Sequence, residues 1–237
     1  MTVFSNISKI NPDNNKTWKN KIFLTFDIDW AHDEIIEDCY NIIASYSVST
    51  TWFVTHNSKF LNVLKNDNNV ELGIHPNFNN LLFNNDNKSS SIVLNELLEI
   101  VQDPTSVRSH SLTQNERLID LFRDCGLTHV SNFFLPHCSN IKGIPFYLWE
   151  KMIMIPHFWQ DNVSIKMKSG FPLNENKLQS FQVYNFHPIH VYLNTADLNI
   201  YEKTRSIHHN PNELISFRHD GYGVRSQLIQ LLETCIS

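Results

Sequence analysis

The sequence has few cysteines, few charges and no long apolar run, and each of these absences excludes a class of protein. Its four cysteines lie far apart without a CxxC pair, which is typical of reduced, mostly buried thiols rather than of a disulfide framework. These cysteines are Cys39, Cys125, Cys138 and Cys235. No window reaches about 18 uninterrupted apolar residues, so we expect no membrane span.

Charged residues make up only 18% of the chain, and the formal net charge is −5. The absence of a dense lysine and arginine block argues against nucleic-acid binding through phosphate neutralisation. The first residues lack a basic start followed by an apolar core, so we expect no signal peptide and predict a cytoplasmic location. Oligomeric state stays open, because a sequence shows no surface patch.

The 237 residues suffice for one large domain, and 41% of them are hydrophobic, enough for a substantial core. Residues 1–20 are polar and rich in asparagine and lysine, which predicts a surface arm. Residues 21–237 show no internal repeat and no clear linker, so we expect them to form a single domain.

The domain is organised around Lys21–Ala31, which reads KIFLTFDIDWA. An apolar run that ends abruptly in Asp27 and Asp29 predicts a buried, parallel strand with acids at its carboxyl end. Residues two apart on a strand share a face, so both carboxylates can reach one pocket, where one ligates a metal and the other moves a proton. The alternative explanation for the two acids is that the strand leads into a helix, whose N-terminus also favours acidic residues.

Strands and helices alternate along the rest of the chain. We expect further strands over 49–55, 70–74, 128–134 and 182–186. We expect helices over 34–46, 59–64, 92–100, 114–125 and 226–235. Residues 77–91 are expected to form a long polar loop. This alternation predicts βαβ units and therefore an α/β fold with a parallel sheet or barrel.

Residues that can bind a metal or move a proton follow several of these strands, namely Asp27, Asp29, His75, His187 and, close behind it, His190. The approach to the helix expected over 114–125 carries two more, Arg108 and His110. A single histidine is more often structural than catalytic. Several such residues at equivalent strand ends indicate an active site at the carboxyl edge of a (β/α) fold.

These residues lie in motifs that resemble those of the polysaccharide deacetylase superfamily, the NodB-homology group of carbohydrate esterase family 4. The motifs are, in order, TFDID, TWFVT, ELGIHPNF, VRSHSL, WQDN and NFHPIHVYLN. They are most similar to the WbmS-like branch, which is associated with bacterial surface-polysaccharide loci. The resemblance implies a distorted (β/α) barrel of about seven strands. It also implies a divalent metal, commonly zinc, that serves to hydrolyse N-acetyl groups of amino sugars.

The resemblance assigns roles residue by residue. Asp27 matches the general base and Asp29 a metal ligand. His75 matches the first histidine of a metal-binding pair, but the residue four positions on is Asn79. The third ligand is then either the weak carbonyl oxygen of Asn79 or a residue from elsewhere. His110 is the candidate, because imidazole is a far better zinc ligand than an amide.

Four further residues have expected roles. Arg108 matches the arginine that holds the base, and a guanidinium there would keep the base ionised. Asp161, in WQDN, resembles the acid that orients catalytic side chains. His187 matches the general acid, with His190 as its alternative or its support. Trp159 is expected in the core or in the cleft wall, where it would stack on a sugar.

Three functions compete. The first is a metal-dependent deacetylase that acts on amino sugars of a bacterial surface polysaccharide, in lipopolysaccharide or capsule, or on a precursor. The second is a related metal-dependent amidase or deformylase with a small substrate. The third is a carbohydrate-binding module that has lost the metal, and Asn79 is the main argument for it.

Overall fold

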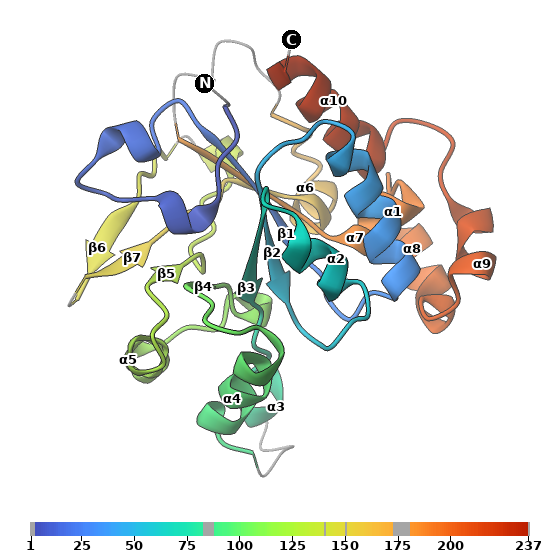
Figure 1. Cartoon of the computed structure of the whole chain (residues 1–237). Coiled ribbons are helices and arrows are strands. Elements are labelled where there is room, and N and C mark those ends of the chain that lie inside the picture. Colours follow the sequence, from blue (N-terminus) through green and yellow to red (C-terminus); the bar gives the residue numbers. More distant parts are fainter. Residues whose placement is uncertain (1–2, 83–87, 140, 150, 173–180, 237) are drawn as a thin grey trace.

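The computed structural model describes residues 3–82, 88–139, 141–149, 151–172 and 181–236. Over these residues the chain folds into a single α/β domain around one curled sheet of nine strands (Figure 1). In chain order the strands are β1 (Ile22–Asp27), β2 (Thr50–Val54), β3 (Val70–Ile74), β4 (Ser106–Val107), β5 (His129–Val130), β6 (Phe146–Leu148), β7 (Met152–Met154), β8 (Trp159–Gln160) and β9 (Gln182–Phe186). Their order across the sheet is β6-β7-β5-β4-β3-β2-β1-β9-β8.

All neighbouring strands in this sheet pair in parallel except β6 and β7, which are antiparallel. This pairing confirms the predicted α/β class and the distorted barrel type. The strand count is nine rather than about seven. The difference comes from short pairings such as β8, which has two residues and is too brief to show a period in the sequence.

Helices cover the outside of the sheet. The α-helices are α1 (Asp33–Ala44), α2 (Leu61–Asn66), α3 (Asn79–Leu82), α4 (Ser90–Ile100), α5 (Glu116–Asp124), α6 (Asp161–Met167), α7 (Pro188–Leu193), α8 (Leu198–Thr204), α9 (Pro211–Leu214) and α10 (Val224–Ile236). In Figure 1, α1, α7 and α10 lie together on one side, where α7 packs against both others. Of these described helices, none has the length and apolar character to cross a membrane.

Two expected segments differ in extent. The polar loop predicted over 77–91 contains α3 and the start of α4, and its residues 83–87 lie outside the described residues. The strand predicted over 128–134 shrinks to β5, with two paired residues. The start of α4 is set locally by the Ser89 N-cap, whose side chain accepts a hydrogen bond from the Ile92 N–H. The extent of β5 is set by its pairing with β4 and β7 rather than by local propensity.

The strand β1 shows how the sheet divides its two faces. Alternate residues of β1 pack in the main hydrophobic core under the helices, namely Ile22, Leu24 and Phe26. Phe23 packs in a second, smaller core on the opposite face. Because side chains alternate along a strand, Thr25 and Asp27 lie on that same opposite face, inside the curled sheet. The predicted acid thus points into the interior of the barrel.

The N-terminal segment closes the amino ends of the strands. Ile7 and Ile10 are 0% and 2% exposed and pack with Phe23 in the second core. The Ile7 N–H donates to Thr51 Oγ1 at 3.0 Å, and the Ile10 carbonyl lies 3.0 Å from His129 Nε2. Composition indicated a surface arm, which is wrong for this part. A few apolar residues in a polar background are enough to seal the sheet.

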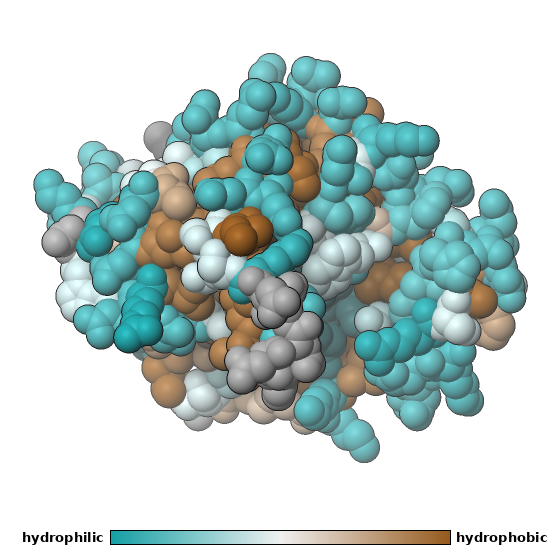
Figure 2. Space-filling view, turned by 90° about the horizontal axis from the view of Figure 1, so that it is seen from below, coloured by the Kyte–Doolittle hydropathy of each residue, from teal (hydrophilic) through white to brown (hydrophobic). Residues whose placement is uncertain are grey.

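Figure 2 views the molecule from the side on which α3 and α4 lie in Figure 1. Hydrophilic residues cover most of this face, and hydrophobic residues are exposed among them toward its centre. Because β1, β3, β4 and β9 run parallel within one sheet, their carboxyl ends meet at a common edge. The predicted site residues follow these ends.

Candidate active site

Asp27, the last residue of β1, is buried and held by two donors. Its Oδ1 accepts a hydrogen bond from Arg108 Nη1 at 2.9 Å, and its Oδ2 accepts one from Asn185 Nδ2 at 2.7 Å. Burial raises the pKa of Asp27, but the Arg108 guanidinium, His75 and His187 together outweigh burial and hold that pKa below its usual range. Asp27 is therefore an ionised carboxylate in a fixed orientation.

Arg108 crosses the interior of the sheet and is fully buried. Its Nη1 also donates to Thr25 Oγ1 at 2.9 Å and to Asn185 Oδ1 at 2.6 Å. Its Nη2 donates to Ser131 Oγ at 2.9 Å, and its guanidinium lies 4.5 Å from the centre of the Phe53 ring. The rigid fork of one arginine thus joins β1, β2 and β9 to the segment after β5.

Asp29 lies just beyond β1, in a left-handed turn. Its φ is +40°, and that of Trp30 is +57°. Because the strand ends at Asp27, the predicted sharing of one strand face is wrong, and this turn brings Asp29 into the site. Two successive non-glycine residues with positive φ are strained, and such strain is concentrated at functional sites. The Trp30 N–H donates to Thr55 Oγ1 at 3.0 Å and holds the turn.

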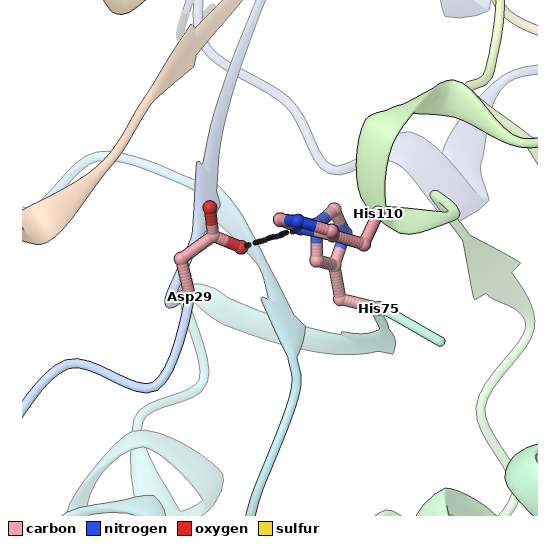
Figure 3. A group of neighbouring side chains, drawn as sticks. All are labelled: Asp29, His75 and His110. Atoms are coloured by element: carbon pink, nitrogen blue, oxygen red, sulfur yellow. Dashed lines mark ion pairs between the residues drawn. The ribbon is translucent and has the colours of Figure 1, made fainter. Parts of the chain in front are cut away.

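Two imidazoles from separate strands lie beside Asp29 (Figure 3). His75 follows β3 and places its Nε2 3.2 Å from Asp29 Oδ1, while His110 follows β4 and places its Nδ1 3.3 Å from the same oxygen. One ligand atom from each of the three residues lies within 4.8 Å of the others. Figure 3 shows the three side chains pointing toward one another.

This group has the chemistry of a divalent cation site. Among the described residues, Asp29 Oδ1 is a buried acceptor that receives no hydrogen bond, although two ring nitrogens lie beside it. Such an acceptor is costly unless another group completes it. Burial raises the pKa of Asp29, but His110, His75 and His187 hold it well below its usual range. An ionised carboxylate and two imidazoles fit zinc.

Asn79 supports His110 instead of replacing it. Asn79 Nδ2 donates to Ser111 Oγ at 3.0 Å, and Asn79 Oδ1 accepts a hydrogen bond from Thr113 Oγ1 at 3.4 Å. Ser111 has a φ of +55° within the short 3-10 helix His110–Leu112. The amide therefore steadies the turn that carries His110, and its oxygen is already engaged. Of the two predicted third ligands, the geometry favours His110.

His187 directly follows β9 and is the N-cap residue of α7, where Pro188 occupies the first helical position. Its Nδ1 lies 2.6 Å from Asp161 Oδ1, and its backbone N–H donates to Asp161 Oδ2 at 2.6 Å. Its Nε2 lies 3.5 Å from Asp29 Oδ2 and 3.9 Å from Asp27 Oδ2. Burial lowers the pKa of His187, but Asp161, Asp29 and Asp27 raise it to about 10. Asp161 thus orients His187 toward the two carboxylates.

His190 lies behind His187, with 5.8 Å between the ring centres. Its Nδ1 lies 3.1 Å from Thr195 Oγ1. Burial lowers the pKa of His190 to about 4, so its ring is neutral near pH 7. The helical turn after β9, rather than a regular strand, brings it there. These contacts favour His187 as the acid and His190 as its support.

Trp159 does not line the site. It is 1% exposed, and the rings of Phe171 and Phe186 lie 5.0 Å and 4.7 Å from its own ring centre. On β8 its side chain falls on the face that packs in the main core. No ring face is open to a sugar, so the prediction of stacking at Trp159 is wrong.

The sequence interpretation missed two residues of this region, Asn185 and Trp30. Asn185 lies on β9, two positions before His187, which directly follows the strand, and both side chains lie beside Asp27. Counting back from His187 would have found it. Trp30 is 49% exposed directly after Asp29, and no local pattern distinguishes it from a core aromatic.

Comparison with known proteins agrees with this geometry. The model of the family described as WbmS-like polysaccharide deacetylase matches residues 24–205. The chain belongs to this family. A crystal structure of a candidate polysaccharide deacetylase involved in O-antigen biosynthesis, from Bordetella bronchiseptica, is 36% identical to it. That match has a TM-score of 0.94 and covers 98% of this chain and 97% of the other, which confirms the fold expected for a WbmS-like deacetylase.

Two more distant structures also match. A candidate polysaccharide deacetylase from Mycobacterium smegmatis is 14% identical, with a TM-score of 0.49 and coverage of 90% of this chain and 89% of the other. A 4-alpha-glucanotransferase from Thermococcus litoralis is 10% identical, with a TM-score of 0.43 and coverage of 90% and 35%. No curated protein matches this member of the family.

Proposed function

We propose that this chain is a metal-dependent N-deacetylase that acts on amino sugars of a bacterial surface polysaccharide or its precursor. Membership of the WbmS-like family supports the deacetylase chemistry, and the relative described in O-antigen biosynthesis supports the class of substrate. The observation that carries the proposal is the convergence of Asp29, His75 and His110. They lie next to Asp27, which is ionised and held in place.

Asp29, His75 and His110 would hold the metal. Zinc is the expected ion, because two imidazoles and a carboxylate suit it better than magnesium or calcium. When bound, the cation supplies a Lewis acid that polarises the acetyl carbonyl and eases the deprotonation of water. The argument for a module without metal depended on Asn79, and the position of His110 beside Asp29 supports a metal site instead.

Asp27 takes a proton from the attacking water while the water oxygen bonds to the acetyl carbonyl carbon. Arg108 and Asn185 each donate to one carboxylate oxygen, and so they aim the base and favour its ionised form. Because these hydrogen bonds are already formed, the side chains around the base need little reorganisation during the reaction.

His187 protonates the nitrogen as the C–N bond breaks. Asp161 accepts the hydrogen bond at Nδ1, so Nε2 is the nitrogen that faces the substrate side. A neutral amine leaves far more readily than an amide anion, which is why a proton donor is needed here. The products are acetate and the free amino sugar.

Acetate release tests the proposal. The zinc-loaded protein is incubated with monomeric, oligomeric and nucleotide-linked N-acetylated amino sugars, and in parallel with small amides and formamides. Release of acetate from the sugars, lost in Asp27→Asn, is the expected result. Ammonia or formate from the small substrates alone would instead identify an amidase or deformylase. Absence of both zinc binding and turnover would indicate a binding module.

A further inference from the structure

Trp30 is an exposed aromatic residue at the edge of the metal group, the proposed ligands Asp29, His75 and His110. It follows Asp29 directly, and 49% of its surface is open to solvent. Its ring centre lies 5.2 Å from that of His110, with the two planes inclined at 74°. Isolated exposed aromatics are common on protein surfaces, but this one contacts a residue of the site.

The backbone around Trp30 is built to turn its side chain outward. Asp29 and Trp30 both have positive φ, which is unfavourable for a bulky residue and would be relieved by glycine. The Trp30 N–H donates to Thr55 Oγ1, which holds this conformation. The same turn sends the Asp29 carboxylate toward the two imidazoles and leaves the Trp30 indole half exposed beside them.

We propose that Trp30 is the platform on which the pyranose ring of the N-acetylated sugar stacks. This inference depends on the deacetylase function proposed above and specifies how that site selects a cyclic sugar. The apolar C–H face of a pyranose packs on an indole, while its hydroxyl groups stay in water at the open edge. Because Trp30 touches His110, a sugar on the indole has its acetamide within reach of the metal group. Trp30 thus takes the role that burial denies to Trp159.

The test compares Trp30→Ala and Trp30→Phe with a matched control. Trp149 is 51% exposed at the turn between β6 and β7, at the outer edge of the sheet, so Trp149→Ala removes an equally exposed indole elsewhere. Steady-state kinetics use a trimer of N-acetylglucosamine and, as an acyclic probe, N-acetylethanolamine. Calorimetry measures binding of the trimer to the metal-free proteins, and zinc content is measured in each variant.

Trp30→Ala is expected to raise KM for the trimer, and its Kd in the metal-free protein, by about 10-fold, since loss of one aromatic stacking contact costs about that much in affinity. Trp30→Phe recovers most of this loss, because it restores a ring. The loss with the acyclic probe is much smaller, since that probe has no ring to stack. Trp149→Ala matches the wild-type protein.

Two results overturn the inference. One is an unchanged KM and Kd for the trimer in Trp30→Ala. The other is an equal loss with both substrates together with a loss of zinc, which would mean that Trp30 merely supports His110. Failure of the proposed function looks different, because the wild-type protein then releases no acetate from any sugar. In that event, weaker trimer binding by metal-free Trp30→Ala would still support the platform.

Discussion

Asp27 and Asp29 are two residues apart in the sequence, yet their surroundings are opposite. Both oxygens of Asp27 accept hydrogen bonds, from Arg108 and Asn185. Asp29 Oδ1 accepts none from the described residues, and only imidazole nitrogens lie beside it. The protein therefore holds the Asp27 carboxylate in place with its own donors, whereas the open acceptor of Asp29 is where the proposed metal would bind.

This difference separates an inner network from an outer group. The inner network consists of Asp27, Arg108 and Asn185, which are all buried. The outer group consists of Asp29, His75 and His110, and it includes a strained turn and two partly exposed side chains. Changes in the outer group should empty the site while the fold persists. Changes in the inner network should damage chemistry or stability while the outer group persists.

The largest effect is expected from His75→Ala. Loss of one imidazole from three ligands should abolish stoichiometric zinc binding and with it acetate release, because two remaining ligands hold zinc poorly. Metal analysis after dialysis and an acetate assay measure this. His209→Ala, at an exposed histidine, is the control. Full zinc content in His75→Ala would show that the outer group has been misassigned.

Asp27→Asn should lower kcat by roughly 10²–10⁴, the usual contribution of a general base. The amide keeps the size of the side chain, so zinc content should match that of the wild-type protein. This combination of lost turnover and retained metal distinguishes the inner network from the outer group. Wild-type turnover in Asp27→Asn would exclude Asp27 as the base.

Arg108→Leu should destabilise the fold by about 3–5 kcal/mol, because it leaves the buried Asp27 carboxylate without its charged partner. Urea unfolding measures the change. The double variant Arg108→Leu with Asp27→Leu should recover part of the loss, since it removes the orphaned charge as well. A double variant less stable than the sum of the single effects would contradict this account.

Asn79→Ala should weaken zinc affinity by about 10–100-fold, as is usual when a residue that orients a metal ligand is removed. The reason is the loss of its hydrogen bonds to Ser111 and Thr113, which hold the turn of His110. Competition with a zinc chelator measures the affinity, and the exposed neighbour Asn80→Ala serves as control. Equal affinity in both variants would leave Asn79 without a role in the outer group.

The smallest expected effect is on the pH dependence of stability, through the buried His157, whose pKa the inner-network residue Arg108 helps to lower. Burial and the neighbouring Arg108 lower the pKa of His157 to about 3, although Asp27 and Gln160 act in the opposite direction. His157 is thus neutral in the folded chain and becomes protonated on unfolding below about pH 6.5. Because only the unfolded chain binds this proton, the free energy of unfolding should fall as the pH drops below about 6.5, by at most about 1.4 kcal/mol per pH unit.

Urea unfolding between pH 7 and pH 5 tests this slope. His157→Gln should flatten it relative to the wild-type protein, whereas His209→Gln should not, because His209 is exposed. Parallel slopes in the wild-type protein and His157→Gln would show that another group controls the pH dependence.

The order of strands and helices, and the residues at the strand ends, could largely be predicted from local patterns. The apolar run before Asp27 and the helical spacing after it are periodic signals, and a parallel sheet brings its carboxyl ends together whatever the details. Those signals are enough to predict that Asp29 and His75 lie close together at one edge of the sheet.

Side-chain direction and the exact ends of the strands were beyond prediction, and three errors follow from them. Trp159 faces the core, Ile7 and Ile10 seal the strand ends, and Asp29 reaches the site from a turn instead of a strand. Each depends on packing against segments distant in sequence, which local periodicity does not record.

The sequence by itself determined the α/β alternation and most of the candidate site residues, because the alternation follows from short-range periods and most of those residues stand at strand ends. Only the tertiary structure decided that His110 stands where Asn79 was an alternative, and that His187 rather than His190 faces the carboxylates. Those choices depend on contacts such as Arg108 with Asp27, 81 residues apart, whose geometry exists only once the sheet has curled.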